Sequence, residues 1–450
     1  MKTCLLIRTG IFDDINSTFN SLKTSGFEKF YFLESDLDNR FKYDVPIEKK
    51  YVYNYSILNF WKIIFDLRNK NFYEIIIMFT GNRIHFSFGL LIAVLISILK
   101  KTSLKYVNSV GKLIETGKIN AIKIAAGKLF SLKTLNYLLV VFSSKFKLSR
   151  NLGMPVETIL ETAAICNLRC PFCPEGRLEQ KRKRGFMTMD DFKKIMSEAA
   201  PYLWYANLDL MGEPLLNKDL PEMIKFTKNL GVEYVEISSN GNHILNDEDA
   251  ERIVKSGLNK MIISIDAADQ DVYEKYRVGG KVNKIIDFTT AIVKAKKKLN
   301  SEHPRLDFQI VVSQQNINQI EKVDELRKKI GGDNLKIKPM SFLIANISGN
   351  EVKDFITSVQ ENRYTFTDEK IAPQKAILNC APIYFILNIS WDGDIIPCCS
   401  DTYFEMKIGN AIKEKSIKNV WNGKVFKNFR KKVNTDRNSI PACVRLCGKL

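Results

Sequence analysis

Strand-like apolar runs alternate with helical patterns across the middle of the chain. The strand-like runs lie at 156–164, 203–210, 232–238, 260–266, 306–312 and 335–339, and the helical patterns at 190–200, 219–229, 247–256, 284–298 and 318–330. This alternation predicts parallel strands joined by right-handed helical crossovers. Eight such units would close a full barrel, and six are present. In barrels of this kind the chemistry is expected at the C-terminal ends of the strands.

Three cysteines follow the first of these strands. Cys166, Cys170 and Cys173 are separated by three and then two residues, on the loop that leaves the strand at its C-terminal end. Three thiolates on one loop suit a soft metal centre. A structural zinc site would need a fourth ligand nearby, and the next cysteine is Cys380. Three protein ligands for a four-iron cluster leave one iron open, as a catalytic metal requires.

This C-x3-C-x2-C spacing, with Phe172 before the last cysteine, resembles the signature of the radical SAM superfamily. The resemblance implies an open (β/α)6 partial barrel. It also implies a [4Fe-4S] cluster whose open iron binds S-adenosylmethionine, and an electron donor such as flavodoxin or ferredoxin. An electron from that cluster would cleave the sulfonium, and the 5′-deoxyadenosyl radical would abstract a substrate hydrogen. Phe172 is expected among the cofactor-binding residues.

Two later strand ends resemble further motifs of the family. Met211-Gly212-Glu213-Pro214 resembles its G-G-E-P motif, with Met211 in place of the first glycine. The resemblance implies that Gly212, Glu213 and Pro214 hold the amino group of S-adenosylmethionine, and a carboxylate can accept the hydrogen bonds of an ammonium. Ser238-Ser239-Asn240-Gly241 is similar to the (S/T)-N-G element, which makes Ser238 and Asn240 cofactor-binding candidates.

The fourth strand and the stretch after it add three more candidates. Ser264 and Asp266 point the same way on a strand, where they could meet the ribose hydroxyls or the carboxylate end of the cosubstrate. Arg277 lies in a Y-x-x-Y-R-x-G-G stretch that resembles one in SPASM-type members. A guanidinium suits bidentate carboxylate binding; the alternative is an arginine on a helix surface. The basic run 180–185 is a screen for an anionic substrate or a solvated loop. No general acid or base is singled out.

A second cysteine group lies after residue 379. An alternating run to Ile389, a turn at Trp391 and a return strand to Cys398 predict a β-hairpin. The order is similar to the SPASM or twitch domain of radical SAM enzymes. The resemblance implies one auxiliary [4Fe-4S] cluster with the ligands Cys380, Cys398, Cys443 and Cys447, and Cys399 competing with Cys398. Five cysteines favour the single-cluster form. A zinc site with four cysteine ligands is the alternative.

The expected fold class is α/β throughout. We predict a Rossmann-like α/β domain at 1–118, a basic and apolar helical linker at 119–150, the partial barrel at 151–340, a linker at 341–379, and a small Cys-rich hairpin and helix domain at 380–450. The first domain has strands at 3–8, 29–34, 74–79 and 104–108, and helices at 13–25 and 56–68. The apolar run 84–99 is short for a membrane span and is better explained as a buried helix.

The first domain carries no G-x-G-x-x-G fingerprint and no cobalamin-binding pattern. It faintly resembles the N-terminal half of sugar-nucleotide glycosyltransferases. The formal net charge is +18, and Lys and Arg greatly outnumber the single acid Glu115 between 100 and 150. That segment predicts either peripheral contact with anionic lipid or a solvated basic face. No signal peptide is visible, so a cytoplasmic location is expected.

The predicted function is that of a radical SAM enzyme, oxidoreductase-like, acting on a small molecule of the sugar or aminocyclitol type or on a peptide. The other class considered is a nucleic-acid-modifying or RNA-binding protein that uses its basic face. Positive charge alone supplies only nonspecific attraction to phosphate, and the aromatic residues show no base-stacking motif. Specific nucleic-acid binding is therefore not expected.

Overall fold

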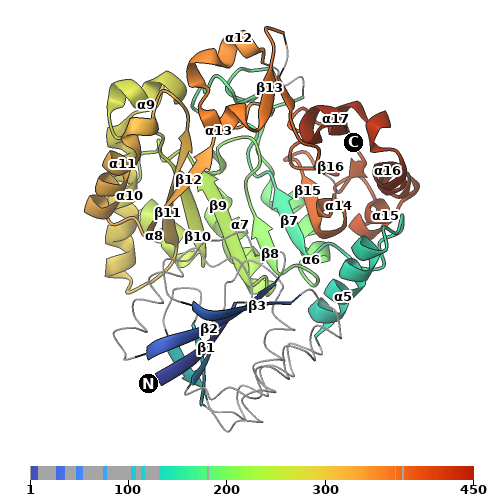
Figure 1. Ribbon diagram of the computed structural model, residues 1–450, viewed down its shortest axis with the longest axis horizontal. Coiled ribbons are helices and arrows are strands. Elements are labelled where there is room, and N and C mark those ends of the chain that lie inside the picture. The colour runs from blue at the N-terminus through green and yellow to red at the C-terminus, as the bar shows by residue number, and fades with distance from the viewer. Residues whose placement is uncertain are drawn as a thin grey trace. The chain divides into compact units, whose positions relative to one another are not determined.

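The computed structural model (Figure 1) describes the strands 2–8, 27–35, 47–53, 74–78, 103–107 and 113–116, and residues 131–449 except 180–181, 344, 346, 370 and 378–379. The chain forms two compact units, Met1–Tyr137 and Leu138–Leu450. Helix α5 (Leu132–Lys145) spans the boundary between them. Among the described residues, no helix is both long and apolar enough to cross a membrane.

The first unit contains a six-stranded sheet. Its strand order is β3-β2-β1-β4-β5-β6, all pairs being parallel except β5 with β6. The order of its first five strands is typical of Rossmann-type sheets. The strands are β1 (Lys2–Arg8), β2 (Phe27–Ser35), β3 (Ile47–Tyr53), β4 (Glu74–Met78), β5 (Ser103–Val107) and β6 (Leu113–Thr116). The sequence did not predict β3 or β6. The helices predicted at 13–25, 56–68 and 84–99 lie outside the described residues.

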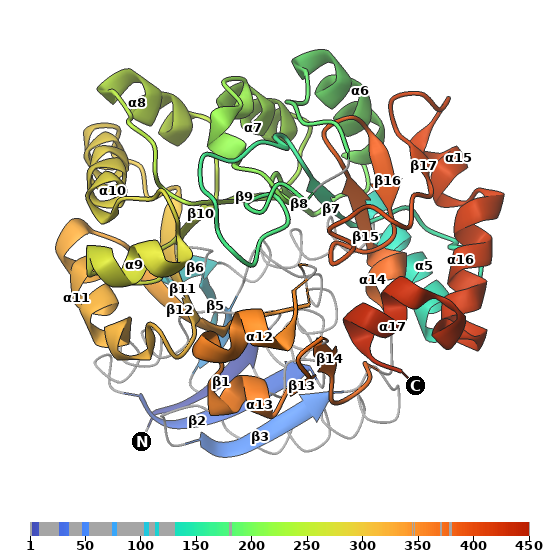
Figure 2. The same ribbon diagram turned by 90° about the horizontal axis from the view of Figure 1, so that it is seen from above.

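The second unit is built on a nine-stranded sheet of order β12-β11-β10-β9-β8-β7-β15-β16-β17. Strands β7 to β12 run parallel to one another and confirm the partial barrel. Seen from above, they form a curved row with helices along its outer side (Figure 2). The strands are β7 (Glu157–Leu160), β8 (Tyr205–Asn207), β9 (Tyr234–Ser239), β10 (Lys260–Ser264), β11 (Arg305–Val312) and β12 (Asn334–Pro339).

The helices that cover this sheet lie close to their predicted ranges. They are α6 (Met189–Ala199), α7 (Leu220–Asn229), α8 (Asp247–Lys255), α10 (Val282–Lys298) and α11 (Ile320–Ile330), with the unpredicted α9 (Gln270–Tyr276) between β10 and α10. Side chains alternate along each strand. On β9, Val235 and Ile237 are fully buried, whereas Glu236 and Ser238 point to the opposite face. That second face, the inner face of the half-barrel, is polar.

The C-terminal cysteine hairpin continues the barrel sheet. Strand β15 (Ile386–Ile389) pairs in parallel with β7, and β16 (Asp394–Ile396) and β17 (Gly409–Asn410) follow as antiparallel neighbours. The Thr158 hydroxyl also donates to the Leu387 carbonyl at 2.9 Å. Around the hairpin lie α14 (Pro382–Phe385), α15 (Ile417–Trp421), α16 (Lys424–Thr435) and α17 (Pro441–Cys447).

Residues 341–379, which the sequence suggested as a linker, are folded instead. They form α12 (Gly349–Val352), α13 (Ser358–Glu361), β13 (Tyr364–Phe366) and β14 (Ile371–Pro373), which we call the cap segment. Capping boxes at Ser348 and Thr357 begin its two short helices. Its buried apolar residues share a core with Phe172 of the first cysteine loop.

Candidate metal and cofactor site

The three thiols of the first cysteine loop lie close together after β7. Cys170 is buried, and Cys166 and Cys173 are partly buried. Burial, helped by neighbouring negative charges, raises the pKa of both Cys166 and Cys170 to about 11. Cys173 is shifted in the same direction for the same reasons. Three such thiolates need a cationic centre to offset their charge, so the donor set fits an iron–sulfur cluster.

The Gly212 turn packs directly against this loop. A Cβ atom on Gly212 would lie 2.2 Å from the Ala163 carbonyl oxygen and 2.8 Å from the Ile165 nitrogen. The Glu213 N–H donates to the Ile165 carbonyl at 2.8 Å. Only glycine allows this approach of two backbones, which explains why the turn keeps its second glycine while Met211 replaces the first.

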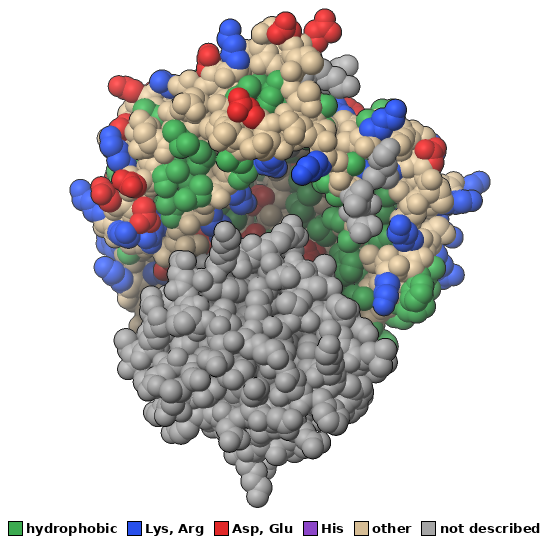
Figure 3. Space-filling model, viewed as in Figure 1, with side chains coloured by type: hydrophobic (Ala, Val, Ile, Leu, Met, Phe, Trp, Pro, Cys, Tyr) green, Lys and Arg blue, Asp and Glu red, His purple; other side chains and the backbone are tan. Residues whose placement is uncertain are grey.

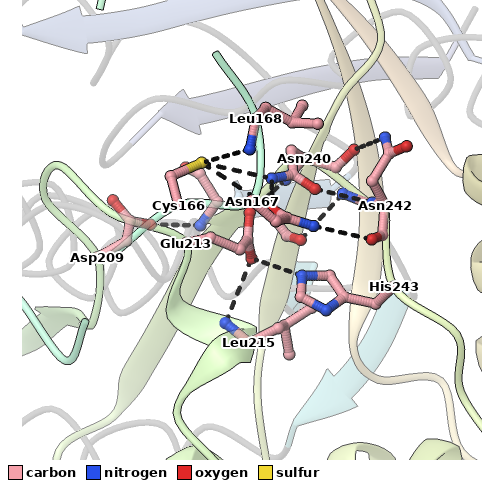
Figure 4. Close-up of polar contacts among 12 residues, drawn as sticks. Cys166, Asn167, Leu168, Asp209, Glu213, Leu215, Asn240, Asn242 and His243 are labelled. Carbon is pink, nitrogen blue, oxygen red and sulfur yellow. Dashed lines mark hydrogen bonds and ion pairs between the residues drawn. The ribbon is translucent and has the colours of Figure 1, made fainter. Parts of the chain in front are cut away.

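Glu213 is almost fully buried and joins the turn to β9. Its carboxylate accepts hydrogen bonds from the backbone N–H groups of Leu215 at 3.2 Å and Asn240 at 2.8 Å (Figure 4). The His243 ring nitrogen Nε2 lies 3.4 Å from Oε1 of the same carboxylate. Pro214 follows as the first residue of a short 3-10 helix. The sequence analysis missed His243, which no motif marks.

Three asparagines tie the cysteine loop to the end of β9 (Figure 4). The Asn240 side chain donates to Asn167 at 2.7 Å, and its Nδ2 lies 3.8 Å from the sulfur of Cys166. Asn167 in turn donates to the Asn242 carbonyl at 3.0 Å. The sequence analysis did not single out Asn167 or Asn242. The only sequence feature that could have marked them is their position, since Asn167 directly follows Cys166 and Asn242 directly follows the (S/T)-N-G element.

Asp266 and Arg277 form a buried ion pair. Nε of Arg277 lies 2.5 Å from Oδ2 of Asp266, and NH1 of Arg277 lies 3.9 Å from the sulfur of Cys170. Arg277 is thus no surface arginine. Ser264 lies two residues before Asp266 and is also nearly buried. The structure therefore brings Asp266 and Arg277 together at the cysteine loop, as the motifs suggested.

The side chain of Phe172 points away from the thiols. It is 2% exposed and packs in an edge-on arrangement against Phe342 and Phe355, at ring-centroid distances of 5.5 and 4.8 Å. Tyr276 lies on it at 5.8 Å. Burying the ring against the cap segment removes its apolar area from water. The expected contact of Phe172 with the cofactor stays a prediction.

The inner face of the half-barrel carries an unpredicted set of polar side chains. Asp209, just after β8, accepts a hydrogen bond from the Ser238 N–H. Burial nevertheless raises the pKa of Asp209 to about 7. Further down the strands, Lys260 lies 2.7 Å from the carboxylate of Glu236. Ser238 thus contacts Asp209 rather than the cysteine loop.

Four cysteines of the second group influence one another. Burial and the thiolates of Cys398, Cys447 and Cys443 raise the pKa of Cys380 to about 12. A hydrogen bond from Cys399 lowers the pKa of Cys398. Cys399 is exposed, and the other four cysteines of the group are not. The structure thus groups Cys398 with Cys380, Cys443 and Cys447.

A single metal ion fits neither thiol group well. Within the described part of the chain, no three His, Cys, Asp or Glu side chains converge closely enough to hold one ion. Zinc places four sulfurs about 2.3 Å from one point, whereas a four-iron cluster holds its thiolates farther apart.

In the described part of the basic run 180–185, Lys183 and Arg184 are exposed, but the arginines are paired with carboxylates. Arg182 pairs with Glu161, and Arg184 donates through Nε to Glu175 at 2.8 Å. The Trp391 indole donates to the Lys183 carbonyl at 3.2 Å. These bonds fasten the segment to the cysteine loop and to the hairpin.

Comparisons with known proteins agree with this site. The family model of the radical SAM superfamily matches residues 160–327, and that of the SPASM iron-sulfur cluster-binding domain matches residues 380–448. A probable GTP 3′,8-cyclase of Methanococcus maripaludis is 33% identical over 121 residues, which cover 27% of this chain and 39% of the cyclase. The chain thus matches less than half of the length of that relative.

Two further relatives match over longer stretches. The PqqA peptide cyclase of Granulibacter bethesdensis is 24% identical over 296 residues, which cover 61% of this chain and 76% of the cyclase. The crystal structure of Streptococcus suis SuiB bound to the precursor peptide SuiA is 16% identical, covers 74% of this chain and 76% of that one, and has a TM-score of 0.48. The chain belongs to the radical SAM superfamily and carries a SPASM domain, which implies a [4Fe-4S] cluster with S-adenosylmethionine and an auxiliary iron–sulfur centre.

Proposed function

We propose that the protein uses S-adenosylmethionine to remove a hydrogen atom from a polar, hydroxyl-bearing substrate of the saccharide or aminocyclitol type. Cys166, Cys170 and Cys173 would hold the first cluster. Bound together, this cluster and S-adenosylmethionine supply a 5′-deoxyadenosyl radical. The observation that carries the proposal is that these thiols, the Gly212 turn and Asn240 meet at the C-terminal end of the parallel strands.

Groups beside the thiols are suited to orienting the cosubstrate. Gly212, Glu213 and Pro214 would receive its amino group, because the turn presents backbone carbonyls and a buried carboxylate. Asn240 and Ser264 lie at the ends of the adjoining strands and would line its ribose and carboxylate, whereas Ser238 is engaged by Asp209 and Asp266 by Arg277 and Val311. An electron donor of the flavodoxin or ferredoxin type completes the proposal.

The polar inner face favours a hydroxylated substrate over an apolar one. Asp209, Glu236 and Lys260 offer both charges and several hydrogen-bonding groups on this face. A carboxyl group with a pKa of about 7 is well matched to accept a proton near neutral pH. Asp209 is therefore proposed to take the proton of a substrate hydroxyl group.

The auxiliary centre is proposed to act in electron transfer. Cys380, Cys398, Cys443 and Cys447 supply four thiols that influence one another. Coordination of every iron by protein would leave none open to the substrate. Electron transfer then remains as the role that this set of ligands supports best.

A peptide is the second substrate candidate. It is favoured by the similarity to PqqA peptide cyclase, which covers 61% of this chain. A flexible peptide backbone would also find hydrogen-bond partners on the polar inner face. The two substrate classes separate by which of them increases 5′-deoxyadenosine formation above the substrate-free level.

The experiment that tests the function is anaerobic reconstitution followed by reduction in the presence of S-adenosylmethionine. We expect 5′-deoxyadenosine to form in the unchanged protein and not in the Cys170→Ala variant. If the protein forms none and instead binds RNA with a steep dependence on salt concentration, the alternative of an RNA-binding protein holds.

We also propose that the segment 100–150 makes peripheral contact with anionic lipid, and helix α5 is the described part of it that supports this proposal. Leu138, Phe142 and Phe146 are exposed on or just after α5, and Lys145 and Lys147 stand beside them. Figure 3 shows hydrophobic and basic side chains next to one another where α5 lies in Figure 1. This combination suits an anionic membrane surface. Absence of flotation of the full chain with anionic vesicles would exclude the contact.

A further inference from the structure

We propose that Arg277 sets the reduction potential of the first cluster by donating a hydrogen bond to the sulfur of Cys170, and that Asp266 is the positioning residue that aims it. This inference rests on the proposed function, because it requires a cluster on Cys166, Cys170 and Cys173. It assigns Arg277 a different role from binding the carboxylate of S-adenosylmethionine.

The geometry around the guanidinium carries the proposal. NH1 of Arg277 lies 3.9 Å from the Cys170 sulfur, within reach of a hydrogen bond to sulfur. On its other side Nε donates to Asp266 at 2.5 Å. The Tyr276 ring centroid lies 5.2 Å from the guanidinium carbon. The group is thus held between a carboxylate, an aromatic ring and a cluster ligand.

The backbone around Arg277 is fastened to the cysteine loop. The Arg169 N–H, between Cys166 and Cys170, donates to the Val278 carbonyl at 3.0 Å. The Gly280 N–H donates to the Arg277 carbonyl at 2.8 Å, and Gly279 has a φ of +83°, where glycine is favoured. The Y-x-x-Y-R-x-G-G stretch therefore brings its arginine to the cluster loop as part of one turn.

Asp266 is in turn fixed by its own partners. Its second oxygen, Oδ1, accepts the Val311 N–H at 2.7 Å, and its carbonyl accepts a hydrogen bond from the Asn316 side chain at 2.8 Å. Both carboxylate oxygens are thus engaged by the protein. The direction of the guanidinium follows from this rigid anchor, which points NH1 at the sulfur.

A donor and a positive charge beside a cluster sulfur stabilise the reduced cluster, which carries one more electron than the oxidised form. Hydrogen bonds to the sulfurs and the local charge are known to set the potentials of such clusters. The effect is stronger in a buried site, where water screens charges less. Loss of Arg277 should therefore make the first cluster harder to reduce.

The test is a redox titration of the first cluster, followed by its electron paramagnetic resonance signal. Cys398→Ala and Cys443→Ala are introduced in all samples, so that only the first cluster contributes. We expect Arg277→Gln to lower the midpoint potential of the first cluster by about 59 mV. For a one-electron couple this shift corresponds to a tenfold change in the equilibrium constant of reduction. Arg277→Lys keeps the positive charge, so its midpoint potential should lie between those of the unchanged protein and of Arg277→Gln. If Arg277→Gln does not bind a cluster, the lysine variant is titrated in its place.

Arg169→Gln is the matched control. Its guanidinium lies in the same loop but donates at 3.0 Å to the carbonyls of Cys166 and Leu168 rather than to a sulfur. Because Arg169 is exposed and its charge is screened by water, this variant should lower the potential much less than Arg277→Gln does. An Arg277→Gln protein with unchanged potential but weakened binding of S-adenosylmethionine in equilibrium dialysis would overturn the inference in favour of carboxylate binding. Absence of any cluster on the Cys166 loop of the unchanged protein would instead overturn the proposed function, and this inference with it.

Discussion

Arg182 and Glu161 form a bidentate ion pair beside the first cysteine loop, and the auxiliary domain contacts this pair. Both contacts are 2.5 Å long, and the two side chains are 8% and 0% exposed. The Trp391 N–H also donates to Glu161 at 3.2 Å, and the Arg182 guanidinium lies 4.1 Å above the Phe404 ring. One buried pair thus joins the two halves of the metal-binding region.

Replacing Arg182 by alanine should destabilise the second unit strongly. It leaves the Glu161 carboxylate buried without its partner, which typically costs about 3–5 kcal/mol. Urea unfolding of cluster-free protein measures the loss. Lys294→Ala is the control, because Lys294 and Asp247 form a pair with side chains 65% and 68% exposed, and such pairs contribute about 0–1 kcal/mol.

The Arg182→Ala defect should grow with pH. Burial raises the pKa of Glu161, and Arg182 lowers it. Without Arg182 the pKa rises further, so the folded state keeps a proton that the unfolded state loses above its ordinary pKa of about 4.5. Stability of the variant then falls as the pH rises from that value. Equal losses at pH 5 and pH 8 would contradict this account.

Removing the first thiol set should halve the iron content. Reconstituted protein is expected to hold about eight irons, and the triple variant of Cys166, Cys170 and Cys173 to alanine about four. Cys398→Ala should lower the content to a similar level, while Cys399→Ala should keep all of it. About four irons in the unchanged protein, with no change on losing Cys398, would exclude the auxiliary cluster.

Asp209→Asn should stabilise the protein while impairing turnover. Between about pH 4 and 7 the folded state binds a proton at Asp209 that the unfolded state has lost, so stability falls as pH rises through this window. The asparagine variant lacks this loss. At pH 8 its free energy of unfolding should exceed that of the unchanged protein by on the order of 2–4 kcal/mol.

Denaturation at several pH values checks the Asp209 prediction. Asp269→Asn is its control, because Lys322 lowers the pKa of this exposed carboxylate, so its loss should bring no gain at pH 8. If the free energy of unfolding changes with pH in the same way for Asp209→Asn and for the unchanged protein, the pKa of Asp209 is not raised.

Phe172→Ala should loosen the cap segment. Removing a buried aromatic side chain typically costs 3–5 kcal/mol, and here the cavity would open between Phe342 and Phe355. Hydrogen exchange at 347–366 should therefore become faster than in the unchanged protein. Phe172→Leu, which keeps most of the apolar volume, should show a smaller effect, and equal exchange in both variants would count against this packing.

The sequence predicted the barrel strands because each element there carries its own periodic pattern. The six predicted strands and five crossover helices all appear, with boundaries shifted by a few residues. Helix α9 was missed because its seven residues are too few for a clear periodic signal. The cap segment was missed because its helices have four residues each, too short for a periodic signal.

Contacts between distant segments set the limit of prediction for the site. The spacing of Cys166, Cys170 and Cys173 was enough to predict a shared site. Pairing of Arg182 with Glu161 and the inward direction of Asp209 depend on how strands and loops meet in three dimensions, which a local pattern does not encode. Phe172 shows the same limit, because its ring was drawn into a core formed by residues about two hundred positions later.

The parallel pairing of β7 with β15 has a consequence for the order of events during synthesis. Leu160 pairs with Ile389, so the first strand of the barrel stays an unpaired edge on that side until the hairpin has left the ribosome. Contacts between such distant segments form late. The loop that carries Cys166 follows this strand directly. We therefore expect iron to be delivered to its thiols after synthesis of the hairpin rather than during synthesis of the barrel.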